Sequence, residues 1–174
     1  MGAAYQHEAG IGDITGRGAR VKGLDMPATA TIGIAAQVTD KLLLAADYKR
    51  VFWSESMNTI TISQNDIEMQ MPQNWNDQNV FSLGLAYNAT EKLTLRLGAN
   101  LANNPIEEHC TPLFPAIIKN HYTAGFGYQF SDTHSLNASF AYAPEVEKAN
   151  GLNFTGTSTT HSQISCQLMY SFTF

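Results

Sequence analysis

Charged residues and long apolar runs are both scarce in this sequence. Only 14% of its 174 residues are charged, and no run of 18 apolar residues occurs, so the sequence predicts no transmembrane helix. Yet 44% of the residues are hydrophobic, at a mean hydropathy of −0.18. Few charges without a hydropathy peak are typical of a membrane β-barrel, because alternating apolar and polar residues cancel in a window average.

Basic residues and cysteines are few as well. The net charge of −5 argues against a nucleic-acid partner. We expect no disulfide between Cys110 and Cys166, because a loop and a strand place them far apart. The first residues, 1–7, have neither the basic nor the apolar region of a signal peptide, so we expect either a mature protein or the tail of a longer chain.

The last eleven residues, 164–174, alternate strictly between apolar and mostly small or polar side chains. This period of two predicts a β-strand with one apolar and one polar face. A lipid-facing barrel strand has this pattern, with its polar face toward the lumen. The terminal aromatic residues also resemble the signal that bacterial barrel-assembly machinery reads: Tyr170, Phe172 and Phe174.

Six further segments alternate in the same way, and a weaker one precedes them at Met1–Glu8. Ten strand residues tilted in a barrel span about 25 Å, the height of a lipid-facing band. The sequence therefore predicts an all-β fold, a transmembrane antiparallel β-barrel with seven or eight strands in this chain. The six segments are Pro27–Val38, Lys41–Trp53, Asp77–Asn88, Lys92–Leu101, Ile117–Phe130 and His134–Ala143.

The connections alternate between short and long. This layout predicts short periplasmic turns and long extracellular loops in a bacterial outer membrane. Aromatic residues fall near both ends of the strands, as two interfacial girdles would require, whereas a soluble up-and-down barrel has no such need. The short turns are 39–40, 88–91 and 131–133, and the long loops are 10–26, 54–76, 102–116 and 144–160.

Several motifs in register resemble the carboxy-terminal half of the FadL/TodX-type outer-membrane transport proteins. They are Pro27-Ala-Thr29, Trp75-Asn-Asp77, Asn104-Pro105 and Phe114-Pro-Ala-Ile117. The resemblance implies passive uptake of long-chain fatty acids or other hydrophobic small molecules, with no catalysis and no cofactor. It also implies a barrel of about fourteen strands, plugged by an amino-terminal hatch.

We therefore expect residues 1–174 to form one partial barrel that lacks the hatch and the signal peptide. The alternative is a complete eight-stranded barrel with a structural or adhesive role. An eight-stranded interior is just filled by side chains, and the small inward residues here would leave it underpacked.

Three charged residues are predicted to point into the lumen: Asp47, Lys49 and Arg96. A charge inside a barrel needs a partner or water. One of the two cations could meet a carboxylate substrate or pair with the hatch. The alternative is a structural ion network among lumen side chains.

The long loop 54–76 carries an unusual number of apolar residues. Because methionine adapts to varied apolar ligands, this loop could form a hydrophobic groove at the extracellular mouth. Alternatively, 59–63 and 67–71 form a hairpin whose side chains pack against each other. The candidate mouth residues are Met57, Ile60, Ile67, Met69 and Phe114.

Other chemical signals are weak. Glu107, Glu108, His109 and Cys110 lack a second ligand pair for a metal. His161 and Ser162 are neighbours in a strand and face opposite ways, so they do not predict a catalytic dyad. The glycine-containing segment 10–23 has no phosphate-binding context, and we expect it to be a mobile loop.

Overall fold

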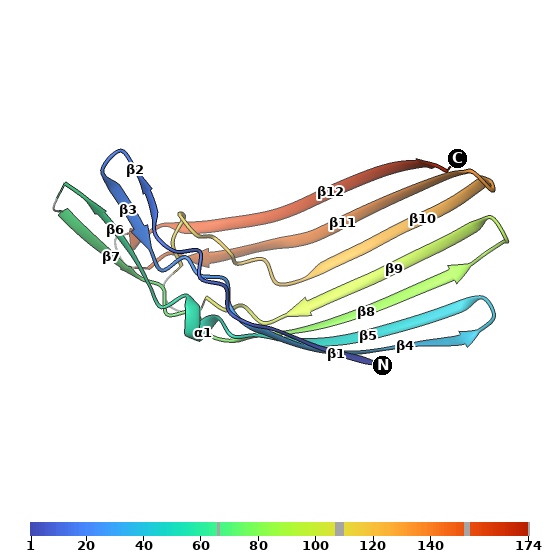
Figure 1. The fold of residues 1–174 in the computed structure, drawn as a ribbon, viewed down its shortest axis with the longest axis horizontal. Coiled ribbons are helices and arrows are strands. Elements are labelled where there is room, and N and C mark those ends of the chain that lie inside the picture. Colours follow the sequence, from blue (N-terminus) through green and yellow to red (C-terminus); the bar gives the residue numbers. More distant parts are fainter. Residues whose placement is uncertain (66, 107–109, 152–153, 174) are drawn as a thin grey trace.

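The protein consists almost entirely of β-strands arranged in two sheets (Figure 1). The structure, a computed structural model, describes residues 1–65, 67–106, 110–151 and 154–173. A short helix, α1 (Trp53–Ser56), lies between two strands. Within the described ranges, no helix is long and apolar enough to cross a membrane.

The larger sheet has eight antiparallel strands, and neighbours in the sheet follow the chain order. All seven predicted strands are present, and the weaker amino-terminal segment forms an eighth. The strands are β1 (Gly2–Gln6), β4 (Thr29–Thr39), β5 (Leu42–Val51), β8 (Gln78–Asn88), β9 (Leu93–Ala102), β10 (His121–Ser131), β11 (His134–Ala149) and β12 (Ser158–Phe172).

The strand register separates apolar from polar side chains across the whole sheet. Asp47 lies opposite Ser82, which lies opposite Asn100, so polar residues form one row. The next row places Tyr48 opposite Phe81, and Phe81 opposite Leu101. Because side chains alternate between faces along a strand, every row of the sheet belongs to one face or the other.

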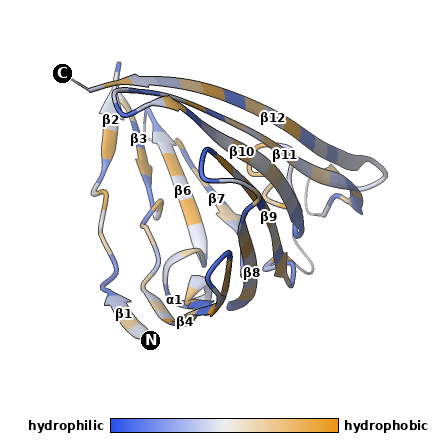
Figure 2. Cartoon of the chain, turned by 90° about the vertical axis from the view of Figure 1, so that its right-hand side faces the viewer, coloured by the Kyte–Doolittle hydropathy of each residue, from blue (hydrophilic) through white to orange (hydrophobic). Residues whose placement is uncertain are grey.

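The polar face is crowded, as the inside of a curved sheet must be. A Cβ atom on Gly98 would lie 2.6 Å from Oγ1 of Thr123, and one on Gly127 would lie 2.8 Å from Oδ1 of Asn137. Glycine at these positions lets neighbouring side chains cross the backbone closely. Figure 2 shows the sheet curving from β4 to β12. The apolar face is then the outer, lipid-facing one.

The two ends of the sheet are open edges. Within the described part of the chain, β1 pairs only with β4, and β12 pairs only with β11. A closed eight-stranded barrel would require β1 to pair with β12. Unpaired backbone groups cost several kcal/mol each in lipid, by the order of magnitude known for such groups. This arrangement therefore fits one side of a larger barrel wall better than a small closed barrel.

A second sheet of four strands lies at the end of the molecule with the long connections (Figure 1). Its strands are β2 (Ile14–Gly16), β3 (Ala19–Lys22), β6 (Thr59–Gln64) and β7 (Ile67–Pro72). The expectation of a loop at 10–23 was wrong. Arg17 and Gly18 have φ values of 50° and 77° between paired strands, and two consecutive residues with positive φ make a tight hairpin turn.

The connection between β11 and β12 is shorter than predicted. The sequence predicted a long loop at 144–160, a segment that begins with Pro144. Instead, β11 continues to Ala149 and β12 begins at Ser158, with a register shift between Ala143 and Val146. A β-bulge accommodates the proline at that position. Conversely, β10 begins only at His121, after Ile117 has entered a buried cluster.

The assignment of faces makes a prediction for charges in the membrane. Leu97 lies in the middle of β9 and is 58% exposed, so Leu97→Arg would place a charge in lipid. We expect a loss of about 2–4 kcal/mol in folding free energy, the usual cost of arginine near the bilayer midplane. Urea unfolding in phospholipid bilayers measures it.

The matched control is Ala35→Arg, at an exposed position on the polar face of β4. A lumen position tolerates the charge, so we expect a change within about 0.5 kcal/mol, as for ordinary surface substitutions. Equal losses for the two variants would contradict the assignment of faces.

Candidate substrate entrance and channel wall

The hydrophobic core lies among the long loops. Its buried members are Met57, Ile60, Trp75, Ile106, Cys110 and Ile117, of which Ile60, Cys110 and Ile117 are completely buried. Partly buried side chains from β3, α1, β6 and β11 pack against them. We call these six residues the loop cluster. By the membrane-barrel rule that long loops are extracellular, the loop cluster faces the outside of the cell.

Backbone hydrogen bonds hold the loop cluster together at α1. The amide of Met57 donates to the carbonyl of Trp53 at 2.8 Å, and the amide of Trp75 donates to the carbonyl of Met57 at 3.2 Å. The rings of Trp53 and Trp75 then meet edge to face, with centroids 5.0 Å apart. Such aromatic pairs add to the free energy of burial, so α1 and the segment before β8 are fixed together.

The structure divides the predicted mouth residues into two groups. Met57 and Ile60 belong to the loop cluster, and Phe114 packs against it. Ile67 and Met69 lie on β7 with 74% and 44% of their surface exposed. The alternative expectation of a hairpin is confirmed, because β6 and β7 are paired along their length. A substrate groove formed by these residues stays a prediction.

An ion pair ties the loop cluster to the barrel strands. Nη2 of Arg50 lies 2.9 Å from Oδ2 of Asp77, while the amide and hydroxyl of Ser54 donate to Oδ1 of Asp77. Burial alone would raise the pKa of Asp77, but the hydrogen bonds from Ser54 and Arg50 hold that pKa below its ordinary value. The carboxylate is therefore charged at neutral pH and caps the start of β8.

Three buried polar atoms near the loop cluster have no hydrogen-bond partner in the described residues. They are Oγ of Ser56, Oε1 of Gln73 and Nε1 of Trp75. Buried polar groups usually find partners, since an unmade hydrogen bond costs about 1–3 kcal/mol. A water molecule or a polar group of a bound compound would satisfy them.

The three predicted lumen charges all lie on the polar face. Asp47 and Lys49 are two residues apart on β5, and Arg96 lies on β9. The ion pairs among the described residues, Arg20–Asp13 and Arg50–Asp77, include none of the three. The expected ion network among lumen side chains is therefore not formed within this part of the chain.

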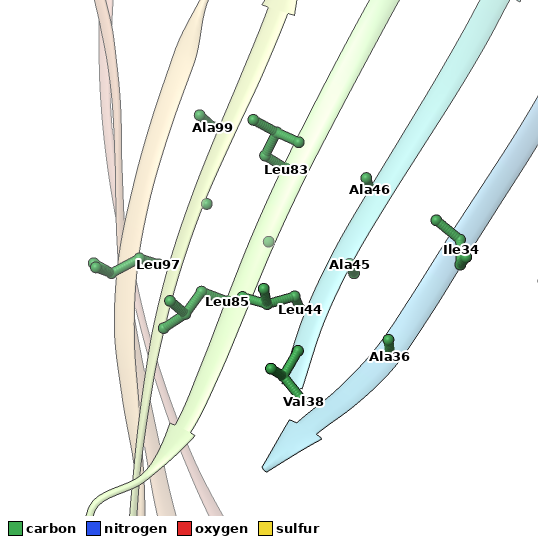
Figure 3. A pocket seen from close by; sticks show the side chains of 12 residues that line it. Ile34, Ala36, Val38, Leu44, Ala45, Ala46, Leu83, Leu85, Leu97 and Ala99 are labelled. Carbon is green, nitrogen blue, oxygen red and sulfur yellow. The ribbon is translucent and has the colours of Figure 1, made fainter. Parts of the chain in front are cut away.

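The outer face of the sheet carries an apolar hollow of about 590 Å³ (Figure 3). Leucine and isoleucine side chains from β4, β5, β8 and β9 surround smaller residues, among them Ala36, Ala46 and Ala99. The lining offers almost no polar group that could orient a solute. Because the hollow faces lipid, acyl chains of the membrane fill it, and we do not assign it a substrate.

Aromatic residues mark the opposite end of the barrel wall, beside the tight turns. His134 stacks on Phe172 with ring centroids 4.8 Å apart and forms a hydrogen bond with Tyr170. These contacts tie the end of β12 to the start of β11. Phe174, the last member of the predicted assembly signal, lies outside the described residues.

No metal site is present in the described part of the chain, where no three potential ligands cluster. Glu107, Glu108 and His109, considered above for a metal, lie outside the described residues. Both cysteines are free: Cys110 is buried and Cys166 is exposed. Burial raises the pKa of the Cys110 thiol, so this side chain behaves as a small apolar residue.

Comparison with known proteins identifies the class of protein that this architecture defines. Residues 3–172 match the family model described as "Outer membrane protein transport protein (OMPP1/FadL/TodX)". The chain therefore belongs to the FadL/TodX family of outer-membrane β-barrels, and it is a bacterial outer-membrane protein. The family consists of transport channels for hydrophobic compounds.

Two curated relatives are similar over much of the chain. One is the 47 kDa outer membrane protein of Pasteurella multocida, 24% identical over 142 residues that make up 79% of this chain and 33% of the relative. The other is outer membrane protein P1 of Haemophilus influenzae, 30% identical over 111 residues, 61% of this chain and 23% of the relative. The matched part is thus a third or less of either relative.

Two solved structures resemble the whole chain. The toluene transporter TbuX of Ralstonia pickettii has a TM-score of 0.74 and 27% identity, with 99% of this chain and 43% of TbuX covered. The toluene transporter TodX of Pseudomonas putida has a TM-score of 0.74 and 28% identity, with 99% and 45% covered. The chain spans less than half the length of these barrels, which agrees with a partial barrel.

The sequence did not predict several residues that build the loop cluster. Ile106 and Cys110 come from a long loop without periodicity, and Ile117 was assigned to the start of a strand, so no pattern marked these three as buried in a cluster. Asp77 lies 27 residues after Arg50 and 23 after Ser54, and only the pairing of β5 with β8 brings it to them. In the sequence, only the motif Trp75-Asn-Asp77 drew attention to any of these residues.

Paired substitutions on the β6–β7 hairpin test the loop cluster. Ile60 is completely buried, so Ile60→Ala should cost about 2–5 kcal/mol of folding free energy through lost burial and a cavity. Ile67 is exposed, so Ile67→Ala should stay within about 0.5 kcal/mol. The two tryptophans of the chain both lie at the cluster, and their fluorescence during urea unfolding reports on it. Similar losses for both variants would argue against the cluster.

The Asp77 network predicts a pH dependence. Because the folded-state pKa of Asp77 lies below the ordinary value of about 3.9, its stabilisation is present above that pH and is lost as pH falls through the folded pKa. We expect Asp77→Asn to cost about 1–2 kcal/mol at pH 7 and much less at pH 3. Tryptophan-monitored unfolding at both pH values measures this.

The control for this prediction is Asp40→Asn in the turn between β4 and β5, which removes a charge far from the network. It should leave the unfolding of the loop cluster unchanged at both pH values. A loss from Asp77→Asn that is equal at pH 7 and pH 3 would show that the carboxylate charge does not matter.

Proposed function

We propose that the protein forms a passive outer-membrane channel for long-chain fatty acids or other hydrophobic small molecules. The observation that carries the proposal is the family match over residues 3–172, together with the likeness of the whole fold to two toluene transporters. The substrate of a relative need not be that of this protein. We therefore keep fatty acids and aromatic hydrocarbons together as hydrophobic compounds.

The geometry supports an entrance at the loop cluster. A hydrophobic solute gains free energy when its apolar surface leaves water, and the exposed side chains of Ile67 and Met69 beside the cluster offer a first contact. The unpartnered atoms of Gln73 and Trp75 could then meet a polar group of the solute. In this proposal Met57, Ile60 and Phe114 support the entrance from below.

The polar face would form part of the channel wall. Its rows of small residues leave room inside the barrel, while Asp47, Lys49 and Arg96 could interact with a solute or with a plug. The open edges of β1 and β12 would pair with further strands of a barrel of about fourteen strands. We propose that residues 1–174 form the carboxy-terminal part of that barrel, whose hatch lies outside them.

The assembly machinery of the outer membrane is a proposed partner during insertion. The last strand, β12, ends in alternating aromatic residues, and we assign Tyr170, Phe172 and Phe174 the role of its recognition signal. The contact of His134 with Phe172 would hold this strand in register once it is inserted. A structural or adhesive role for a small closed barrel has no comparable support.

Uptake measurements test the proposed function. We expect a strain without the gene to take up radiolabelled dodecanoate or toluene more slowly than the parent strain. Restoring the gene should restore the rate, whereas uptake of a small hydrophilic solute should not change. Equal uptake of hydrophobic compounds with and without the gene would contradict the proposal.

A further inference from the structure

The polar face of strands β9 to β12 carries few charges. In its described part, from the tight turns up to the level of Ala143, Arg96 is the one charged residue. Asp47 and Lys49 lie two residues apart on the same face of β5, so their opposite charges offset each other. Through the strand register, Arg96 on β9 is level with Leu43 on β5, two strands away. Asp47 lies four residues further along β5 than Leu43. At roughly 3.3 Å per residue and 4.8 Å per strand, Asp47 is too far to pair with it.

The guanidinium of Arg96 lies in a formed hollow of about 270 Å³. Its Nη1 donates to Oδ1 of Asn137 at 3.4 Å, a long hydrogen bond that leaves most of its donors unused. The side chain lies across Gly127, where a Cβ atom would be 3.0 Å from Nη1 of Arg96. A side chain at position 127 would therefore press against the guanidinium.

The other polar side chains around the hollow are neutral hydrogen-bonding groups. The hydroxyls of Thr123 and Ser139 and the amide of Gln167 line it, and in the described residues these side chains make no hydrogen bond. Its lining contains no carboxylate, and its apolar surface comes from Leu97, Ala124, Ala138 and Met169. The hollow thus combines a cation without a counter-charge and neutral groups that can donate hydrogen bonds. Sites that bind anions have this combination.

We propose that the hollow formed by Arg96, Asn137, Ser139 and Gln167 binds a carboxylate on the inner wall of the barrel. Guanidinium and carboxylate match in a planar, two-pronged geometry, and the hydroxyl and amide groups add further donors. The carboxylate has two possible sources. It belongs either to an amphiphilic solute in the channel or to a polypeptide segment that occupies the lumen. The first source rests on the proposed function, and the second does not.

Binding of dodecanoate to the detergent-purified full-length protein tests the first source. We expect Arg96→Gln to weaken binding roughly ten- to a hundredfold, as the loss of a charged hydrogen-bonding partner does. Dodecan-1-ol, which has the same chain without the charge, should bind the variant and the parent equally. Gly127→Ser should also weaken dodecanoate binding, because its side chain displaces the guanidinium without removing the charge.

Lys41→Gln is the matched control, because it removes a cation in the exposed turn between β4 and β5, outside the hollow. It should leave dodecanoate binding unchanged, and Arg96→Lys should restore part of the binding that Arg96→Gln loses. Loss of binding specific to the carboxylate and to Arg96 would assign the site to a solute.

A polypeptide source gives a different result. Dodecanoate binding then stays unchanged in Arg96→Gln, while the melting temperature falls and the single-channel conductance rises, because a lumen segment is released. If binding, melting temperature and conductance all match those of the parent, the carboxylate site is overturned. Uptake of toluene by the parent strain checks the proposed function separately, since that solute has no carboxylate.

Discussion

The requirement that every backbone N–H and C=O in lipid be hydrogen-bonded governs the rest of this structure. In a sheet, those bonds come only from neighbouring strands, so each strand must cross beside an antiparallel partner. The eight strands of the large sheet satisfy this requirement along their shared lengths. The alternation of side chains follows from the same geometry, because a paired strand must present one face to lipid and the other to the lumen.

This division leaves the barrel wall without a core of its own, and the buried apolar residues gather in the loops instead. The loop cluster connects the β6–β7 hairpin, α1 and the segment before β10. The network of Arg50, Ser54 and Asp77 then fixes the cluster to the ends of β5 and β8. A rigid apolar structure at the outer rim is what a channel for hydrophobic compounds needs at its entrance.

The membrane part of the fold could be predicted from the sequence because its signal is local. A period of two in residues such as Leu93, Leu95 and Leu97 marks both the strand and its lipid face. The loop region could not be predicted from the sequence, since Ile106 and Cys110 are buried by contacts with segments far away in the chain. The loop predicted at 144–160 was too long, because β11 continues past a bulge after Ala143. The groups proposed to meet a solute depend in the same way on neighbours that no local pattern reveals.

The central claim is that the apolar face of the sheet meets lipid and the polar face meets an aqueous lumen. Spin labels at each position of β9 in bilayers would test it through accessibility to oxygen and to a water-soluble nickel complex. The account predicts that Leu95, Leu97 and Ala99 favour oxygen, while Thr94, Arg96 and Gly98 favour the nickel complex, with a period of two. A reversed phase, or no periodicity, would contradict it.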